Sequence, residues 1–390
     1  MRHLIFTSIL LLTTLIQAAE PSSVQFAVRQ LTVDANEGIA AADVDNDGRL
    51  DIVSGRNWYR NAEWSPRPLR IIEDWNGYVQ SNGDFVEDIN GDGLVDVVAG
   101  SFLPTELKWF ENPGAESLRL GKMWSTHLLV DTGQSANEGA LQEDLDGDGR
   151  KELIVNSWQN DVPMAIWRFV NDESGKGLVA KRHQLGESGN GHGCGVGDIN
   201  NDDRNDVLVG QGWYEQPSSG PWDKPWKFHA DWNLQASLPM LVVDLNQDGT
   251  NDLIHGHGHD YGLVWWERTG QDPDGKLKFK EHLIDRGFSE PHALAWGDVN
   301  GDGKSDLVTG KRYYSHNGGD PGGNEPPCIY YYTWNPEKLE FARHVIEEGH
   351  VGIGLQIVLA DFNADGNNDI AVAGKSGTHL LINQGPKASE

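Results

Sequence analysis

The sequence predicts an all-β fold, a seven-bladed β-propeller of four-stranded blades, from three observations. A nine-residue acidic pattern occurs seven times along the chain. Short runs rich in Val, Ile, Leu, Trp and Tyr flank each copy, and Gly, Asn and Pro separate these runs, which is typical of strands joined by turns. The copies lie 45 to 63 residues apart, a spacing that accommodates four short strands per repeat.

Each repeat follows the same order of elements. A short apolar strand precedes the acidic loop, as at Leu241–Val243, and a second strand follows it, as at Leu50–Val53. An aromatic third strand comes next, such as the one containing Trp265 and Trp266. The fourth strand carries a basic residue, which is one of His127, His183, His229, His282, His344, Arg29 and Arg70. Because this position accepts arginine, we interpret its histidines as structural or solvated.

The two ends of the repeat region predict how the propeller closes. The region opens with a lone strand of the fourth type at Val24–Val33 and stops after a third strand at His379–Ile382. The N-terminal strand can therefore complete the last blade, which leaves no long exposed edge. An open solenoid would need capping units, and no repeat has that character.

Charge and the N-terminal residues restrict the class of protein. The 390 residues include 31 basic and 59 acidic side chains, and the formal net charge of −28 excludes nucleic acid and anionic membrane surfaces as partners. Residues 1–19 have a basic start, an apolar run at Leu4–Ile16 and small residues near Ala18, which predicts a signal peptide. We therefore expect an exported protein, periplasmic or extracellular and without membrane insertion, with one propeller domain over residues 20–390.

The acidic loops predict calcium sites. In Asp-x-Asp/Asn-x-Asp-Gly-x-x-Asp/Glu, alternate carboxylate and amide oxygens converge while glycine makes a sharp turn, and Ca²⁺ takes six to eight such ligands. An EF-hand is excluded because glutamate is missing at position 12 and strands flank the loop. Up to seven structural Ca²⁺ sites are expected, with ligands Asp43, Asp45, Asp47, Asp51, Asp88, Asn90, Asp92, Asp96, Asp144, Asp146, Asp148, Glu152, Asp198, Asn200, Asp202, Asp206, Asp244, Asn246, Asp248, Asp252, Asp298, Asn300, Asp302, Asp306, Asp361, Asn363, Asp365 and Asp369.

The fourth loop departs from the pattern because Asp203 replaces the turn glycine. Aspartate tolerates a positive φ better than most residues, but at some strain. We expect this loop to be the weakest of the seven calcium sites.

These seven loops between strands resemble FG-GAP/VCBS repeats, as in the calcium-loaded propeller of integrin α-subunits. The resemblance covers about residues 24–385. It implies a seven-bladed propeller and calcium binding, and it implies little about chemistry because unrelated sites occur on one fold.

A candidate site lies on the face opposite the acidic loops. The segments that precede first strands and follow second strands are expected to ring the channel mouth there. Histidines of units four to six gather in these segments, notably along His255–Tyr261. Candidate catalytic residues are His192, His255, His257, His259, His292, Lys311, Arg312 and Tyr313. Imidazoles can hold an additional divalent metal or transfer protons, although a loop of merely hydrogen-bonded histidines fits the spacing equally well.

The chemistry of this rim favours a carbohydrate or a carbohydrate-derived small molecule. Aromatic faces such as Trp58, Trp158 and Tyr261 can stack on sugar rings while polar groups bind the hydroxyls. The rim resembles that of propeller polysaccharide lyases and, more distantly, the propeller part of aldos-2-ulose dehydratase. That resemblance implies elimination, with a metal, Lys311 or Arg312 stabilising the enolate and a histidine or Tyr313 moving protons.

Two other functions fit the same rim. One is a non-catalytic propeller that binds a glycan or a cell-surface protein, and the other is a hydrolase that uses Glu37, Glu138 and Glu290. Cys194 and Cys328 belong to nonadjacent units, so no disulfide between them is expected. The Gly- and Pro-rich segment Asn317–Pro327 is an insertion expected to form a flap over the rim.

Overall fold

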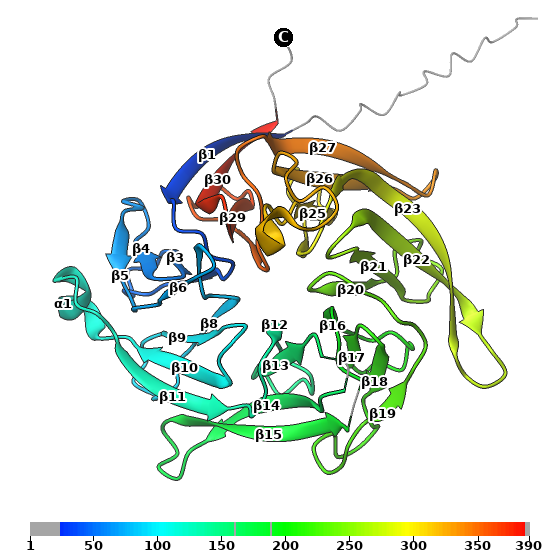
Figure 1. The fold of residues 1–390 in the computed structure, drawn as a ribbon, viewed down its shortest axis with the longest axis horizontal. Coiled ribbons are helices and arrows are strands. Elements are labelled where there is room, and N and C mark those ends of the chain that lie inside the picture. Colours follow the sequence, from blue (N-terminus) through cyan, green and yellow to red (C-terminus); the bar gives the residue numbers. More distant parts are fainter. Residues whose placement is uncertain (1–23, 160, 188, 387–390) are drawn as a thin grey trace, which may run out of the picture.

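A computed structural model of the chain describes residues 24–159, 161–187 and 189–386. Within these ranges the strands form five four-stranded antiparallel sheets, one eight-stranded sheet and a two-stranded ladder. The sheets surround a common centre, with β8, β12, β16 and β20 towards it and β11, β15 and β23 on the outside (Figure 1). The fold is a β-propeller, and the expected signal peptide lies outside the described residues.

Four-stranded groups follow one another along the chain. Their strands are β2 (Ala40–Ala42), β3 (Asp51–Ser54), β4 (Asn57–Tyr59) and β5 (Pro66–Pro68); β8 (Gly83–Glu87), β9 (Asp96–Gly100), β10 (Glu106–Glu111) and β11 (Ser125–Asp131); β12 (Asn137–Glu143), β13 (Glu152–Ser157), β14 (Met164–Asn171) and β15 (Leu178–Gly186); and β24 (Leu294–Gly297), β25 (Asp306–Gly310), β26 (Cys328–Asn335) and β27 (Glu340–Glu348). The small ladder is β6 (Asp74–Trp75) with β7 (Tyr78–Val79), and the short helices are α1 (Gly114–Arg119) and a 3₁₀ turn at Ser315–Gly318.

The eight-stranded sheet consists of two such groups joined at their inner strands. One group is β16 (Cys194–Gly197), β17 (Asp206–Val209), β18 (Gly212–Glu215) and β19 (Lys227–His229), and the other is β20 (Met240–Val243), β21 (Asp252–Gly256), β22 (Tyr261–Gln271) and β23 (Leu277–Ser289). Their connection is a short parallel pairing in which Gly195 lies opposite Met240 and Val196 opposite Leu241. All other pairs within the two groups are antiparallel.

The N-terminal strand completes the last sheet, as the sequence predicts. β1 (Val24–Thr32) pairs antiparallel with β30 (Gly377–Pro386), which continues through β29 (Asp369–Gly374) to β28 (Ile357–Ala360). In Figure 1 the blue first strand lies along the red last strand. The two ends of the chain therefore share one sheet, and the ring is closed by hydrogen bonds between them.

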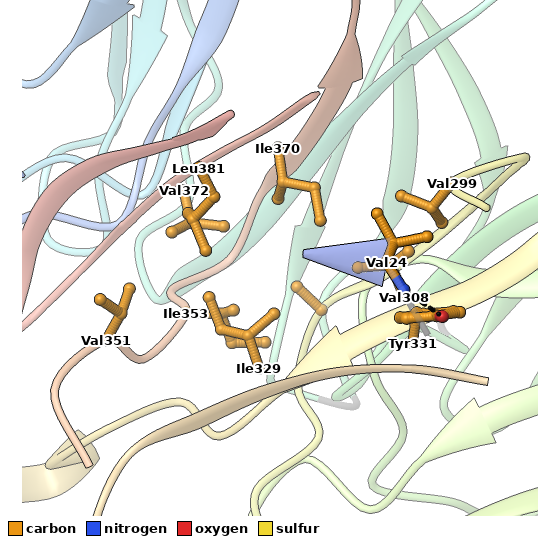
Figure 2. Packing of buried hydrophobic residues seen from close by; sticks show 11 residues of the cluster. Val24, Val299, Val308, Ile329, Tyr331, Val351, Ile353, Ile370, Val372 and Leu381 are labelled. Carbon is orange, nitrogen blue, oxygen red and sulfur yellow. Dashed lines mark hydrogen bonds between the residues drawn. The ribbon is translucent and has the colours of Figure 1, made fainter. Parts of the chain in front are cut away.

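The hydrophobic core is divided into clusters that lie between consecutive groups of strands. In the cluster shown in Figure 2, Val308 and Tyr331 of one sheet pack against Ile370 and Val372 of the next. Val24 of β1 enters the same cluster, and its backbone N–H donates to the Tyr331 hydroxyl at 3.3 Å. Comparable clusters join the other consecutive groups in the described part of the chain. Stability therefore comes from contacts between neighbouring sheets.

In several repeats the histidine of the outer strand stacks on the aromatic residue opposite it. Trp109 and His127, Trp213 and His229, and Trp265 and His282 are direct cross-strand pairs with ring centroids 4.1 to 4.3 Å apart. A nearby glutamate contacts each of these histidines, at 2.7 to 2.9 Å. These contacts assign the outer histidines a structural role.

One residue of that series was wrongly assigned. The arginine opposite Trp58 is Arg67, not Arg70. Arg70 lies after β5, where its buried guanidinium pairs with the buried Asp84 at 2.5 Å. Proline at both ends of β5 shortens the strand, so the spacing to its basic residue differs from that of the other repeats.

The ninth residue of each acidic loop is buried and binds backbone N–H groups. Asp51 accepts a hydrogen bond from the N–H of Val44 at 3.1 Å and another from the N–H of Asn61 at 2.7 Å. Asp96, Asp206 and Asp369 accept the corresponding pairs of bonds. One carboxylate thus fastens the acidic loop and the end of the third strand to the start of the second strand.

An amide side chain next to this carboxylate connects neighbouring sheets. Asn112 donates through Nδ2 to the carbonyl of Val44, in the preceding repeat, at 2.9 Å and to that of Val95 at 3.0 Å. Asn61, Gln216 and Asn383 make equivalent bonds, and the bond from Asn61 to the Phe362 carbonyl crosses the closure of the ring. These amides satisfy buried carbonyls that no sheet partner reaches.

The turn position of the acidic loops has the left-handed backbone that the pattern predicts. Gly48 has φ +85°, and Asp203, which replaces the glycine in the fourth loop, has φ +65°. Among the described residues no helix is long and apolar enough to cross a membrane. Cys194 and Cys328 are buried and unpaired.

We expect Asn112→Ala to lower the free energy of unfolding by about 1–3 kcal/mol, because two buried carbonyls lose their donor. Urea unfolding of both proteins at fixed calcium measures the difference. Asn171→Ala, at an exposed position in β14, is the matched control and should change stability by less than about 0.5 kcal/mol. Equal effects of the two substitutions would show that the amide bridge between the sheets is dispensable.

Candidate functional site

A pocket lies beside the predicted histidines. Its volume is about 750 Å³. It is lined by Phe102, Trp158, Gln159, Asp161, Val162, His192, Asn233, Leu234, Gln235, His259, His316 and Asp320. The side chain of Trp158 is half exposed, which leaves an aromatic surface available to a ligand.

Three imidazoles from three consecutive repeats meet at this pocket. The Nε2 atom of His192 lies 2.8 Å from Nε2 of His259 and 3.1 Å from Nε2 of His292. His192 and His292 are buried, whereas His259 is partly exposed towards the pocket. Three ring nitrogens within 4.8 Å of one another form a donor set that a divalent transition metal can use.

Local backbone structure explains why these rings can approach so closely. His192 and His292 precede the inner strands β16 and β24, and His259 lies in the connection from β21 to β22. A Cβ atom on Gly258 would lie 2.6 Å from the His192 ring and 3.1 Å from the His292 ring. A glycine is therefore needed beside His259 for the three imidazoles to meet.

A carboxylate from the inserted segment contacts the other side of His259. Asp320 Oδ2 lies 3.0 Å from Nδ1 of His259 and 2.9 Å from Nδ1 of His316. The rings of His259 and His316 stack with centroids 4.7 Å apart. Although burial raises the pKa of Asp320, hydrogen bonds with His316, Glu290 and His259 hold it well below its usual range.

A buried ionic network supports the inserted segment. Glu290 accepts from Lys311 Nζ at 3.0 Å and from the Ser315 hydroxyl, which also contacts Asp320 at 3.0 Å. Burial raises the pKa of Glu290, an effect that Ser315 and Lys311 partly offset. Glu290 has φ +59°, in the left-handed region that costs strain for a non-glycine residue.

The predicted cations of the rim lie in buried ion pairs, so neither charge lies on the pocket wall. Lys311 is 1% exposed and contacts Glu290 and Ser289. Arg312 binds both carboxylate oxygens of Glu37, which also accepts from Lys375. Although burial raises the pKa of Glu37, these two cations hold it far below its usual range. The expected roles of Lys311 and Arg312 in stabilising an enolate do not fit this geometry, and nor does a role for Glu37 in hydrolysis.

Tyr313 is partly exposed and lies next to Tyr314, with ring centroids 5.9 Å apart, and it is not among the residues that line the pocket.

The remaining two predicted histidines lie beside the three-histidine cluster, not in it. His257 Nδ1 lies 3.1 Å from the backbone carbonyl of Tyr261. His255 is 1% exposed, and neither of its ring nitrogens has a hydrogen-bond partner among the described residues. Burial lowers the pKa of His255 to about 3. Both rings border a smaller hollow of about 320 Å³.

Two of the acidic loops bring carboxylate oxygens together in the way that a hard cation requires. Asp43, Asp45 and Asp51 offer oxygens within 4.8 Å of one another, as do Asp144, Asp146 and Glu152. Burial and nearby carboxylates raise the pKa of the ninth residue to about 7 in Asp51 and Glu152 and to about 8 in Asp206. Buried like charges of this kind are relieved by a cation, so the residues fit calcium. In the first loop Arg60 contacts Asp45 and Asp47, and so occupies oxygens that an ion would use.

Sequence reasoning missed His316 and Asp320. The Gly- and Pro-rich composition of the segment was the available signal, because it predicts an insertion over the rim. Composition does not show that the insertion folds back onto His259, so its polar residues could not be singled out.

Comparison with protein families identifies the class of protein. A family model for the FG-GAP-like repeat matches residues 144–209 and 244–309. These two parts of the β-propeller therefore match FG-GAP-like repeats, as their acidic loops indicate. No curated protein matches the sequence.

Three solved structures are similar to this chain, and the first of them supports the fold. The exotype rhamnogalacturonan lyase YesX aligns with a TM-score of 0.50 at 13% identity, over 93% of this chain and 74% of the lyase. Sqt1 of Saccharomyces cerevisiae aligns with a TM-score of 0.46 at 10% identity, over 94% of this chain and 99% of Sqt1. BBS1N, in complex with ARL6DN, aligns with a TM-score of 0.49 at 12% identity, over 94% of this chain and 98% of BBS1N. The likeness to the lyase shows the shared propeller fold and nothing of the reaction.

The buried His255 predicts a pH dependence of stability. Its pKa in the folded chain lies below the ordinary 6.5, so protonation favours the unfolded chain. The part of the unfolding free energy that depends on neutral His255 is fully present above pH 6.5 and is lost as the pH falls towards 3. Between pH 7 and pH 5 we expect His255→Leu to lose about 1–2 kcal/mol less unfolding free energy than wild type, measured by urea titration at both pH values. An identical loss in both proteins would contradict this assignment.

Proposed function

We propose that this protein is an exported, calcium-stabilised propeller of seven four-stranded blades that catalyses a metal-assisted elimination on a neutral carbohydrate. The count of seven treats the eight-stranded sheet as two blades, which its two antiparallel halves support. Calcium at the acidic loops is supported by the convergence of carboxylates there. Export is supported by the signal-like character of residues 1–19.

The observation that carries the proposed activity is the convergence of three Nε2 atoms at the edge of the large pocket. His192, His259 and His292 would hold a divalent transition metal. Such an ion, when bound, polarises a substrate carbonyl and so acidifies the neighbouring C–H bond. Trp158 and Phe102 line the same pocket and offer faces on which a sugar ring can stack.

His316 is the group best placed to move the proton. It lines the pocket, and its Nδ1 faces Asp320, which leaves Nε2 to act as a base. In the proposed reaction Nε2 removes the proton from the carbon next to the carbonyl, and the electron pair forms a carbon–carbon double bond. The hydroxyl or alkoxy group on the next carbon leaves with a proton returned by His316, so the products are an unsaturated sugar and water or an alcohol.

The charge of the pocket favours a neutral substrate over a polyuronate. Among the described residues that line it there is no lysine or arginine, and Asp161 and Asp320 add negative charge. Lys311 and Arg312 are each engaged by a buried carboxylate. Apart from the proposed metal, a uronate carboxylate would therefore find no cationic side chain to offset its desolvation, whereas hydroxyl groups can be bound by Gln159, Asn233 and Gln235.

Removal of calcium should destabilise the whole propeller. We expect excess EGTA to lower the melting temperature by on the order of 10 °C, since vacant loops hold carboxylates close together, and added Ca²⁺ to restore it. Thermal unfolding followed by circular dichroism measures the shift, with Mg²⁺ as the control ion. A melting curve that EGTA leaves unchanged would rule out a structural role for calcium.

His192→Ala should remove the tightly held transition metal and lower the elimination rate by at least about 100-fold, because two of the three ring contacts involve His192. Metal analysis gives the first result, and ultraviolet absorbance of the unsaturated product from neutral keto sugars gives the second. His229→Ala, in an outer stack, is the matched control and should retain both properties.

The same assay separates the alternatives. Turnover of uronic-acid polymers in preference to neutral sugars would contradict the proposed substrate. Binding of glycans without a new chromophore from any substrate would contradict catalysis and leave a binding module.

A further inference from the structure

We propose that Asp320 is a positioning residue that holds His259 in the tautomer with its proton on Nδ1, so that the Nε2 lone pair faces His192 and His292. The inference rests on the proposed function for the metal, but the tautomer that it predicts can be measured without any ion. It assigns a role to the inserted segment, which brings Asp320 to the pocket.

The contacts of His259 leave its ring little freedom. Nδ1 lies 3.0 Å from Asp320 Oδ2, while Nε2 lies 2.8 Å from His192. One face of the ring stacks on His316 at an interplanar angle of 22°. Exposure of both partners is low, 16% for the His259 side chain and 17% for that of Asp320, so water competes poorly for their hydrogen bond.

The chemistry of the two groups decides which nitrogen carries the proton. A carboxylate accepts hydrogen bonds and cannot donate them, so the Nδ1 of His259 must be the donor. A neutral imidazole has one N–H, and its other nitrogen then carries the lone pair. That nitrogen is Nε2, the atom that lies within the three-histidine cluster. An acceptor behind a ligating histidine both orients its ring and raises its basicity.

Asp320 can orient the His259 ring because neighbouring side chains hold Asp320 itself in place. Its Oδ2 also contacts the Ser315 hydroxyl at 3.0 Å, and Ser315 contacts the buried Glu290. Glu290 is paired with Lys311, the first residue after β25. A series of contacting side chains thus fixes Asp320 relative to the end of β25.

A second contact of the inserted segment provides a matched control. The Tyr261 hydroxyl donates to Glu325 Oε1 at 2.6 Å, which joins the segment to the first residue of β22, just after the connection that carries His259. Loss of this contact loosens the segment without removing the acceptor from His259. Comparing substitutions at Asp320 and Glu325 therefore separates positioning of the ring from docking of the segment.

The first test reads the tautomer in the full chain freed of transition metal and loaded with calcium. Ring nitrogen chemical shifts should report His259 protonated on Nδ1 in wild type, in Glu325→Gln and in Asp320→Asn, whose amide oxygen can still accept. Asp320→Ala should lose this preference. A mixed or Nε2-protonated His259 in wild type, or no change in Asp320→Ala, would overturn the proposal.

The second test titrates the same four proteins with Co²⁺ and follows its visible absorption. We expect Asp320→Ala to weaken Co²⁺ binding by about 10- to 100-fold and Asp320→Asn to weaken it less, while Glu325→Gln stays within about twofold of wild type. Equal weakening by Asp320→Ala and Glu325→Gln would mean that docking alone matters and would overturn the role of Asp320. Failure of wild type to bind Co²⁺ would refute the proposed metal site, and the tautomer would still decide the role of Asp320.

Discussion

The structure depends on the buried carboxylate at the ninth position of each acidic loop. At the start of a second strand, Asp51, Asp96, Asp206 and Asp369 each accept the N–H of the residue after the loop's first aspartate and an N–H at the end of the third strand. A buried carboxylate is costly unless its oxygens are bonded, and here two backbone groups bond it in the same way in successive repeats. The same residue can offer oxygens to a cation. The repeat motif therefore specifies the strand geometry as well as the predicted ion site.

This repeated geometry positions the candidate site. His192, His259 and His292 come from three consecutive repeats, so the distances between them are set by the packing of neighbouring sheets. Within the eight-stranded sheet, the parallel pairing of β16 with β20 brings two of these repeats into direct contact at the centre. The three histidines lie in connections directly beside strands of these sheets, and the inserted segment adds Asp320 to them.

The sequence predicted the loops and strands that recur in each repeat well, and it predicted the side-chain contacts of the candidate site less well. Acidic loops, strand order and the pairing of the two termini follow from a pattern that recurs along the chain. The histidines could be assigned to one face, but the directions of their side chains could not, because His255 lies within a strand and is buried while His259 lies in a connection and reaches the pocket. Lys311 and Arg312 looked like pocket cations because their buried partners, Glu290 and Glu37, are distant in sequence. Asp320 could not be identified from the sequence because its partner His259 is also distant in sequence.

Closure of the ring by β1 and β30 has a consequence for biosynthesis. β1 is made long before its partner β30, so until β30 is made the backbone groups of β1 lack that partner and Val24 lacks Leu381, a member of the same hydrophobic cluster. The other four-stranded groups each come from one continuous stretch of chain, whereas this sheet combines β1 with β28, β29 and β30. Its assembly is the step at which truncated or stalled chains would be recognised as incomplete.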